Sequence, residues 1–145
     1  MSEPLEYHRA ESHAIAPYQA SEGELYMNPD QEEHFRRILH AWRRELMEEV
    51  DRTVDHMKVD SVHCPDPNDR ATQESDMGLE LLTRERERKL LSKIESTLKK
   101  IDENEYGYCA SCGEEIGIRR LEARPTAELC IDCKTRQEAL EHVQG

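Results

Sequence analysis

Four cysteines are the residues of this chain whose type and spacing could do chemistry. They form two Cys-x-x-Cys pairs, Cys109/Cys112 and Cys130/Cys133, separated by 17 residues. Each pair offers two thiolates to one ion, so two pairs at this distance predict a tetrahedral four-cysteine site. Four soft thiolate ligands favour Zn²⁺ over a hard cation. The alternative interpretation is a pair of redox dithiols or disulfides.

A zinc ion held by four thiolates has no open position for water or substrate, so the predicted metal is structural. The rest of the sequence contains neither a nucleophile elbow nor a glycine loop of the kind that cradles phosphate. We therefore predict that the protein is not an enzyme. The fifth cysteine, Cys64, follows His63 and is either a reactive thiol or an ordinary surface residue.

Composition indicates an elongated, helix-rich and acidic molecule. The 145 residues are 36% hydrophobic and 36% charged, with a formal net charge of −12. This charge repels nucleic-acid backbones, yet residues 84–100 form a basic block with a local net charge of +4. No apolar run is long enough to span a membrane. Cysteines at zinc spacing suit a reducing compartment, so we expect a cytoplasmic protein.

Two long helices are expected to position these residues. Asn28 is a good N-cap before Pro29, and apolar residues then recur at steps of three and four as far as Met57. Two prolines interrupt the pattern at residues 64–67. A second helix follows and ends near 104–107, with Leu79, Leu82, Arg86 or Leu90, Ile94, Leu98 and Ile101 predicted to face the first helix.

Two long helices joined by a short turn must lie antiparallel. The predicted fold is mostly α: a long antiparallel helical hairpin, or coiled coil, on a small four-cysteine zinc-finger base with a C-terminal helix. The expected parts are a loosely structured arm over 1–27, the hairpin over 28–105 with its tip at 62–71, and the base over 106–145. Within the base, Ile116 to Ile118 alternate as a short strand would, and a helix is predicted over 134–143.

The tip is the first candidate interaction site. Asp66 and Asp69 lie in a tight turn at the far end of the predicted hairpin, with Ala71 just behind them. Both acids could simply cap the second helix and favour its N-terminal dipole. Alternatively, the hairpin is a probe that delivers its tip to a partner.

The basic block supplies the second candidate site. Arg86, Leu90 and Lys93 share one face of the second helix, and the antiparallel fold brings its end near Arg124 and Lys134. Converging Arg and Lys side chains suit phosphate groups. The alternative is a solvated face neutralised by neighbouring glutamates.

The motifs resemble those of the DksA/TraR zinc-finger family of bacterial transcription factors. The resemblance runs from about residue 18 to 135. It is carried by Pro65-Asp66-Pro67-Asn68-Asp69-Arg70-Ala71 at the tip, Arg84-Glu85-Arg86-Glu87-Arg88-Lys89 on the second helix, and the stretch from Gly107 through both cysteine pairs to Lys134. Two departures are His63-Cys64 before the tip and Gly78 in a helix interior.

The resemblance implies a function as well as a fold. Such proteins bind RNA polymerase rather than DNA and insert the hairpin into the secondary channel. With guanosine tetraphosphate (ppGpp), they repress ribosomal RNA promoters and assist amino-acid biosynthesis promoters in the stringent response. The resemblance implies a polymerase-acting tip at Asp66, Asp69 and Ala71. It also implies ppGpp contacts at Lys93, Arg124 and Lys134, with Arg86 and Leu90 alongside.

We expect a monomer without sequence-specific DNA binding or membrane association. Two rival hypotheses remain open at this stage. A zinc-ribbon nucleic-acid binder would have to overcome the acidic charge of the chain. A purely structural coiled-coil oligomeriser would make substitutions at the tip silent.

Overall fold

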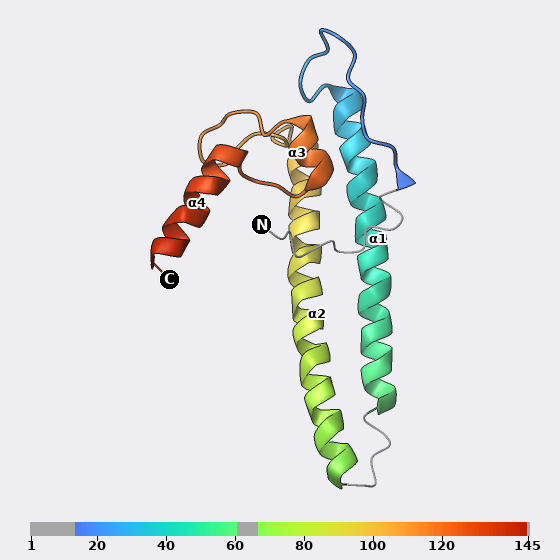
Figure 1. Cartoon of the computed structure of the whole chain (residues 1–145). Coiled ribbons are helices and arrows are strands. Elements are labelled where there is room, and N and C mark those ends of the chain that lie inside the picture. Colours follow the sequence, from blue (N-terminus) through green and yellow to red (C-terminus); the bar gives the residue numbers. More distant parts are fainter. Residues whose placement is uncertain (1–13, 61–66, 145) are drawn as a thin grey trace.

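The computed structural model describes residues 14–60 and 67–144, with the side chains of 53–54, 56–60, 67–71, 73 and 144 left out. Its helices are α1 (Pro29–Asp60), α2 (Pro67–Asp102), α3 (Ile118–Ala123) and α4 (Ile131–Gln144). Helices α1 and α2 form a long antiparallel hairpin, and the short helices lie at the end where α1 begins and α2 ends (Figure 1). The predicted fold class is confirmed. None of the described helices is both long and apolar enough to cross a membrane.

Helix α1 begins where the sequence predicted, because Asn28 caps it. The Asn28 side-chain oxygen accepts a hydrogen bond from the Gln31 backbone N–H at 2.9 Å. The buried Gln31 side chain reaches back and accepts from the Met27 N–H at 2.7 Å. Donors that the first turn of a helix leaves without intrahelical partners are satisfied in this way.

Helix α2 begins at Pro67, whose missing N–H costs nothing at the first helical position. It ends in a Schellman motif: Glu105 donates to the Lys100 carbonyl at 2.9 Å and Asn104 to the Ile101 carbonyl at 3.1 Å. Asn104 adopts the left-handed conformation (φ 60°) that this motif requires. The chain therefore turns sharply into the base.

A single core joins the upper part of the hairpin to the base. Phe35 and Leu39 of α1 are fully buried, as are Ile94 of α2 and Leu121 of α3. The Phe35 ring lies 5.6 Å from that of Tyr106 in the base, measured between ring centroids. The base therefore cannot rotate freely on the hairpin, because both share these side chains.

The lower part of the predicted interhelical seam, the strip where α1 and α2 face each other, was wrong. Leu79 and Leu82 are 62% and 63% exposed, whereas Glu87 is only 6% exposed. Ile94 and Ile101 fix which side of α2 is buried, and counting back by sevens from them gives Glu87 and Glu80. Leu79 and Leu82 do not belong to this seven-residue series, so they lie outside the buried side of α2.

The base has no regular sheet among the residues described. The predicted strand at 116–118 is wrong, because Ile118 begins α3 and the only extended pairing in the described ranges is an isolated antiparallel bridge between Tyr108 and Glu115. Helix α4 covers the predicted 134–143 but starts at Ile131. It diverges from α2 in Figure 1, and Leu140 and Val143 are 64% and 84% exposed.

Residues 14–27 are held against the base by specific hydrogen bonds. The Tyr26 hydroxyl donates to the Gly107 carbonyl at 2.7 Å and accepts from the Gly117 N–H at 3.0 Å. The Tyr18 N–H donates to Glu122 at 2.8 Å. Leu25, by contrast, is 79% exposed. The described part of the N-terminal arm therefore belongs structurally to the base.

Candidate metal centre and hairpin surfaces

The four cysteines predicted as zinc ligands come together in the base. Their sulfur atoms all lie within 4.8 Å of one another. Cys109 and Cys112 are brought together by a tight turn, in which the Gly113 N–H donates to the Cys109 carbonyl at 2.9 Å. Cys130 directly precedes α4 and Cys133 lies in its first turn. One loop and one helix start therefore supply the two pairs.

The sulfur separations fit a tetrahedral metal site rather than a disulfide. Cys112 and Cys130 Sγ are 3.7 Å apart, and all four cysteines are free thiols. A tetrahedron with Zn–S bonds of about 2.3 Å has edges of about 3.8 Å. A disulfide would need about 2.05 Å between the sulfurs. The geometry thus favours zinc over the dithiol or disulfide alternative.

The thiols are crowded in a way that a cation would relieve. Backbone N–H groups, first that of Cys130 and then those of Cys112 and Ser111, lower the pKa of Cys109 to about 6. The Glu114 backbone amide lowers the pKa of Cys112, but burial and hydrogen bonds to neighbouring thiols outweigh it and raise that pKa to about 12. A doubly charged ion would stabilise these neighbouring sulfurs as thiolates.

The structure constrains the predicted tip only in part. Asp66 lies outside the described residues, as do His63 and Cys64. Asp69 and Ala71 fall in the first two turns of α2, at the end of the hairpin opposite the base (Figure 1). Their side chains are outside the described set, so the polymerase-acting role of all three residues stays a prediction.

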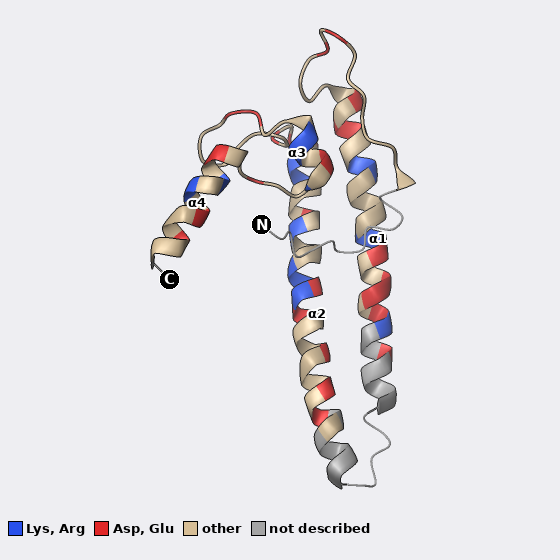
Figure 2. Cartoon of the chain, in the orientation of Figure 1, with Lys and Arg blue, Asp and Glu red and all other residues tan. Residues whose placement is uncertain are grey.

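The predicted phosphate-binding residues come from three places. Arg86 and Lys93 are exposed on α2, and Figure 2 shows the basic block along this helix. Leu90 is half-buried and packs against the core. Arg124 follows α3 and Lys134 lies in the first turns of α4, both half-buried. The role of this set in binding ppGpp stays a prediction.

The sequence interpretation missed one buried polar cluster. His34 is only 9% exposed and its Nε2 contacts a Glu122 carboxylate oxygen, joining α1 to α3. The same oxygen accepts the Tyr18 N–H. The available signal was the position of His34, one residue from Phe35 and three from Gln31, on the side of α1 that the base covers.

Comparison with known proteins identifies the family. Residues 31–101 match the model of the DnaK suppressor protein DksA, N-terminal domain, and residues 104–139 match that of the prokaryotic dksA/traR C4-type zinc finger. The chain is 62% identical over 127 residues to the RNA polymerase-binding transcription factor DksA of Escherichia coli strain K12, covering 88% of this chain and 84% of that protein. The chain belongs to the DksA family.

Further relatives agree with this assignment. The DksA of Haemophilus influenzae is 60% identical over 127 residues, covering 88% of each chain. The solved structure of transcription factor DksA2 from Pseudomonas aeruginosa superposes with a TM-score of 0.78 at 36% identity, covering 92% of this chain and 99% of that one. These relatives are named as transcription factors, which supports the prediction that the chain is not an enzyme. The C4-type match and the cysteine geometry together assign one structural Zn²⁺.

Proposed function

We propose that the chain is a transcription factor that binds RNA polymerase directly and inserts the tip of its hairpin into the secondary channel. One structural observation carries the proposal: two antiparallel helices of 32 and 36 residues extend from a compact base that shares their core. At 1.5 Å per residue each helix is on the order of 50 Å long. Such an arm reaches into a passage too narrow for the base.

The charge distribution supports a protein partner rather than DNA. The formal net charge is −12, and the hairpin carries acidic as well as basic residues along its described length (Figure 2). A DNA-binding surface would need a continuous basic strip. We therefore propose that one chain acts on one polymerase in the cytoplasm, with no sequence-specific DNA contact of its own.

The tip acids are proposed to act on the polymerase once the hairpin is inserted. The direct test is Asp69→Asn, which removes the charge and keeps the shape. We expect polymerase binding to change less than about threefold, while regulation of a ribosomal RNA promoter in purified transcription is lost. Asp76→Asn, an exposed acid two turns along the same helix, is the matched control. Retention of regulation by Asp69→Asn would refute the role of the tip.

The basic residues are proposed to bind ppGpp at the junction with polymerase. In that arrangement Arg124 and Lys134 of the base and Lys93 of α2 contact the phosphates, with Arg86 and Leu90 beside them. Alanine at Lys93 or Arg124 is expected to abolish the additional effect of ppGpp while leaving the nucleotide-independent effect. Lys99→Ala is the control, because its side chain is 77% exposed on the same helix. Equal ppGpp amplification in all variants would refute the assignment.

On this proposal the chain represses ribosomal RNA promoters and activates amino-acid biosynthesis promoters during the stringent response. Both promoter classes should therefore be assayed in the same purified system. Opposite responses are expected, with repression of the ribosomal RNA promoter and activation of the amino-acid biosynthesis promoter. Equal inhibition at both classes would contradict the proposal.

A further inference from the structure

The lower half of α2 presents leucines to solvent. Leu79 and Leu82 are 62% and 63% exposed, and Leu81 is 49% exposed. Leucine is ordinarily a core residue, and nothing in the described part of the chain covers these three. Since scattered surface leucines are common, their number alone means little. Their placement relative to the seam is informative.

Charged residues occupy the seam next to these leucines. Glu87 is 6% exposed, and Glu80 and Arg84 are half-buried on the side of α2 that continues from Ile94. A helix selected only to pair with α1 would place leucine inside and the charges outside. Leu79 and Leu82 therefore contribute little to the stability of the hairpin. Contact with another molecule is the remaining use for their apolar surface.

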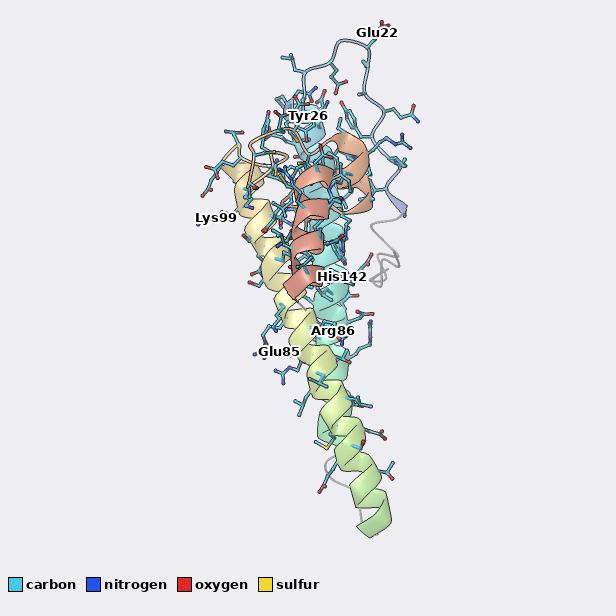
Figure 3. The ribbon with its side chains drawn as sticks, turned by 60° about the vertical axis from the view of Figure 1, so that its left-hand side comes forward. Glu22, Tyr26, Glu85, Arg86, Lys99 and His142 are labelled. Carbon is cyan, nitrogen blue, oxygen red and sulfur yellow. The ribbon has the colours of Figure 1, made fainter. Side chains whose placement is uncertain are left out.

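The exposed leucines are continuous with the basic block. Leu79, Leu82, Arg86 and Lys93 are spaced by three, four and seven residues, so they share one strip of the helix surface. Arg86 and Lys93 are also exposed, and Figure 3 labels Arg86 about midway along the hairpin. The strip is apolar toward the tip and basic toward the base. Its complement is an apolar contact followed by anionic groups, and the ppGpp phosphates proposed to lie at Lys93 are such groups.

The size of the strip argues for a partner that surrounds the hairpin. Two leucines on one helix fall far short of the roughly 1,200 Å² that a stable interface between two copies would bury. A partner that also holds the tip and the base would supply the remaining area, and a small apolar centre can then contribute much of the affinity. Binding in a channel provides this arrangement.

We propose that Leu79 and Leu82 are the apolar anchor by which the hairpin docks on RNA polymerase, against an apolar patch on the tip side of the proposed ppGpp contacts. This inference rests on the proposed polymerase binding. It assigns the contact to one strip of α2, on the base side of the tip and separate from the tip acids.

The test measures binding of the zinc-loaded full chain to purified polymerase. Leu79→Ala and Leu82→Ala are each expected to weaken binding about tenfold, which is 1.4 kcal/mol and within the range for burying a leucine side chain. Leu81→Ala is the matched control, because Leu81 lies about 200° around the helix from Leu79 and about 100° from Leu82. Alanine preserves helix propensity, so circular dichroism should be unchanged for all three variants.

The outcomes separate this inference from the function on which it rests. If the wild-type chain binds polymerase and Leu79→Ala and Leu82→Ala bind it with the same affinity, the anchor role of the two leucines is overturned and the proposed function is not. Equal losses in all three variants, including Leu81→Ala, would also overturn it, because the effect would not follow one strip. A wild-type chain that does not bind polymerase would overturn the proposed function. Sedimentation showing a dimer that Leu82→Ala dissociates would assign the strip to a second copy instead.

Discussion

Replacing Glu87 by leucine should stabilise the protein. Glu87 lies in the seam between α1 and α2, is 6% exposed, and its Oε2 accepts no hydrogen bond from the described residues. A buried carboxylate oxygen without a donor costs free energy, because hydration is lost and little replaces it. Leucine at the same position would continue the apolar series of Ile94 and Ile101.

The magnitude follows from burial. A fully buried leucine contributes roughly 1.5–3 kcal/mol relative to an exposed one, so Glu87→Leu should raise the free energy of unfolding by about 2 kcal/mol at pH 7.5. For a chain of this size the melting temperature would rise by about 4–8 °C. Glu87→Gln removes the charge but adds no apolar surface, so its gain should be smaller.

The gain should depend on pH in a defined direction. Burial, followed by the nearby Glu49 carboxylate, raises the pKa of Glu87, and Arg52 only partly opposes them. The folded chain therefore holds this proton to a higher pH than the unfolded chain does. The contribution of the protonated Glu87 side chain to the free energy of unfolding is fully present below its unfolded-state pKa. It is lost as the pH rises through its folded-state pKa. The advantage of Glu87→Leu should thus be largest at pH 7.5 and shrink toward pH 5.

Urea unfolding followed by far-ultraviolet circular dichroism at pH 7.5 and 5 would measure both effects. Glu85→Leu is the control, because Glu85 is exposed on the same helix and its side chain projects outward in Figure 3. It should change stability by no more than about 0.5 kcal/mol. If Glu87→Leu is no more stable than the wild type, or if its gain is the same at both pH values, the buried position of Glu87 is refuted.

Three further predictions concern the base. Metal analysis should find one zinc per chain, and chelation should unfold the base, because structural zinc supplies on the order of 10 kcal/mol; finding no zinc would contradict the site. Glu122→Ala should lower the unfolding free energy by about 1–3 kcal/mol, since it removes the partner of buried His34; thermal unfolding would show no change if that contact is unimportant. Gly107→Ala should cost about 2–4 kcal/mol, because φ is +94° and the added Cβ would lie 2.8 Å from Met27 Cγ. Gly113→Ala, at φ +78° with open space, should cost only about 1–2 kcal/mol, and equal losses in denaturant titrations would refute the packing argument.

The parts of the fold that local chemistry dictates could be predicted from the sequence. Cysteine spacing predicted the metal cluster, and the Asn28 cap located the start of α1. Two prolines predicted the break between the long helices. In each case a few residues close in sequence decide the outcome, so no distant contact was needed.

The buried side of α2 could not be predicted in this way. The leucines at 79 and 82 suggested the wrong side, because the frame is fixed by Ile94 and Ile101 further along the helix. Those two isoleucines are buried by the core that α2 shares with α1 and the base. A helical repeat read along one segment does not contain that information.

Contacts within the base were equally hidden from the sequence. The burial of His34 depends on Glu122, which is 88 residues away. Ile118 begins a helix rather than ending a strand because the chain turns at Gly117 (φ +101°). The Gly117 N–H donates to the hydroxyl of Tyr26, 91 residues away, so this turn too is supported from a distant part of the chain.

Apolar packing between the long helices weakens with distance from the base. Leu46 is buried on α1, but on the tip side of Leu90 the seam of α2 is formed largely by Glu87, Arg84 and Glu80, with Met77 half-buried beyond them. Backbone amides near Ile94 should therefore exchange with deuterium far more slowly than those near Gly78. Within the described part of the hairpin, α2 should therefore be stiffer near Ile94 than near Gly78, and the stretch near Gly78 can adapt to the walls of whatever encloses it.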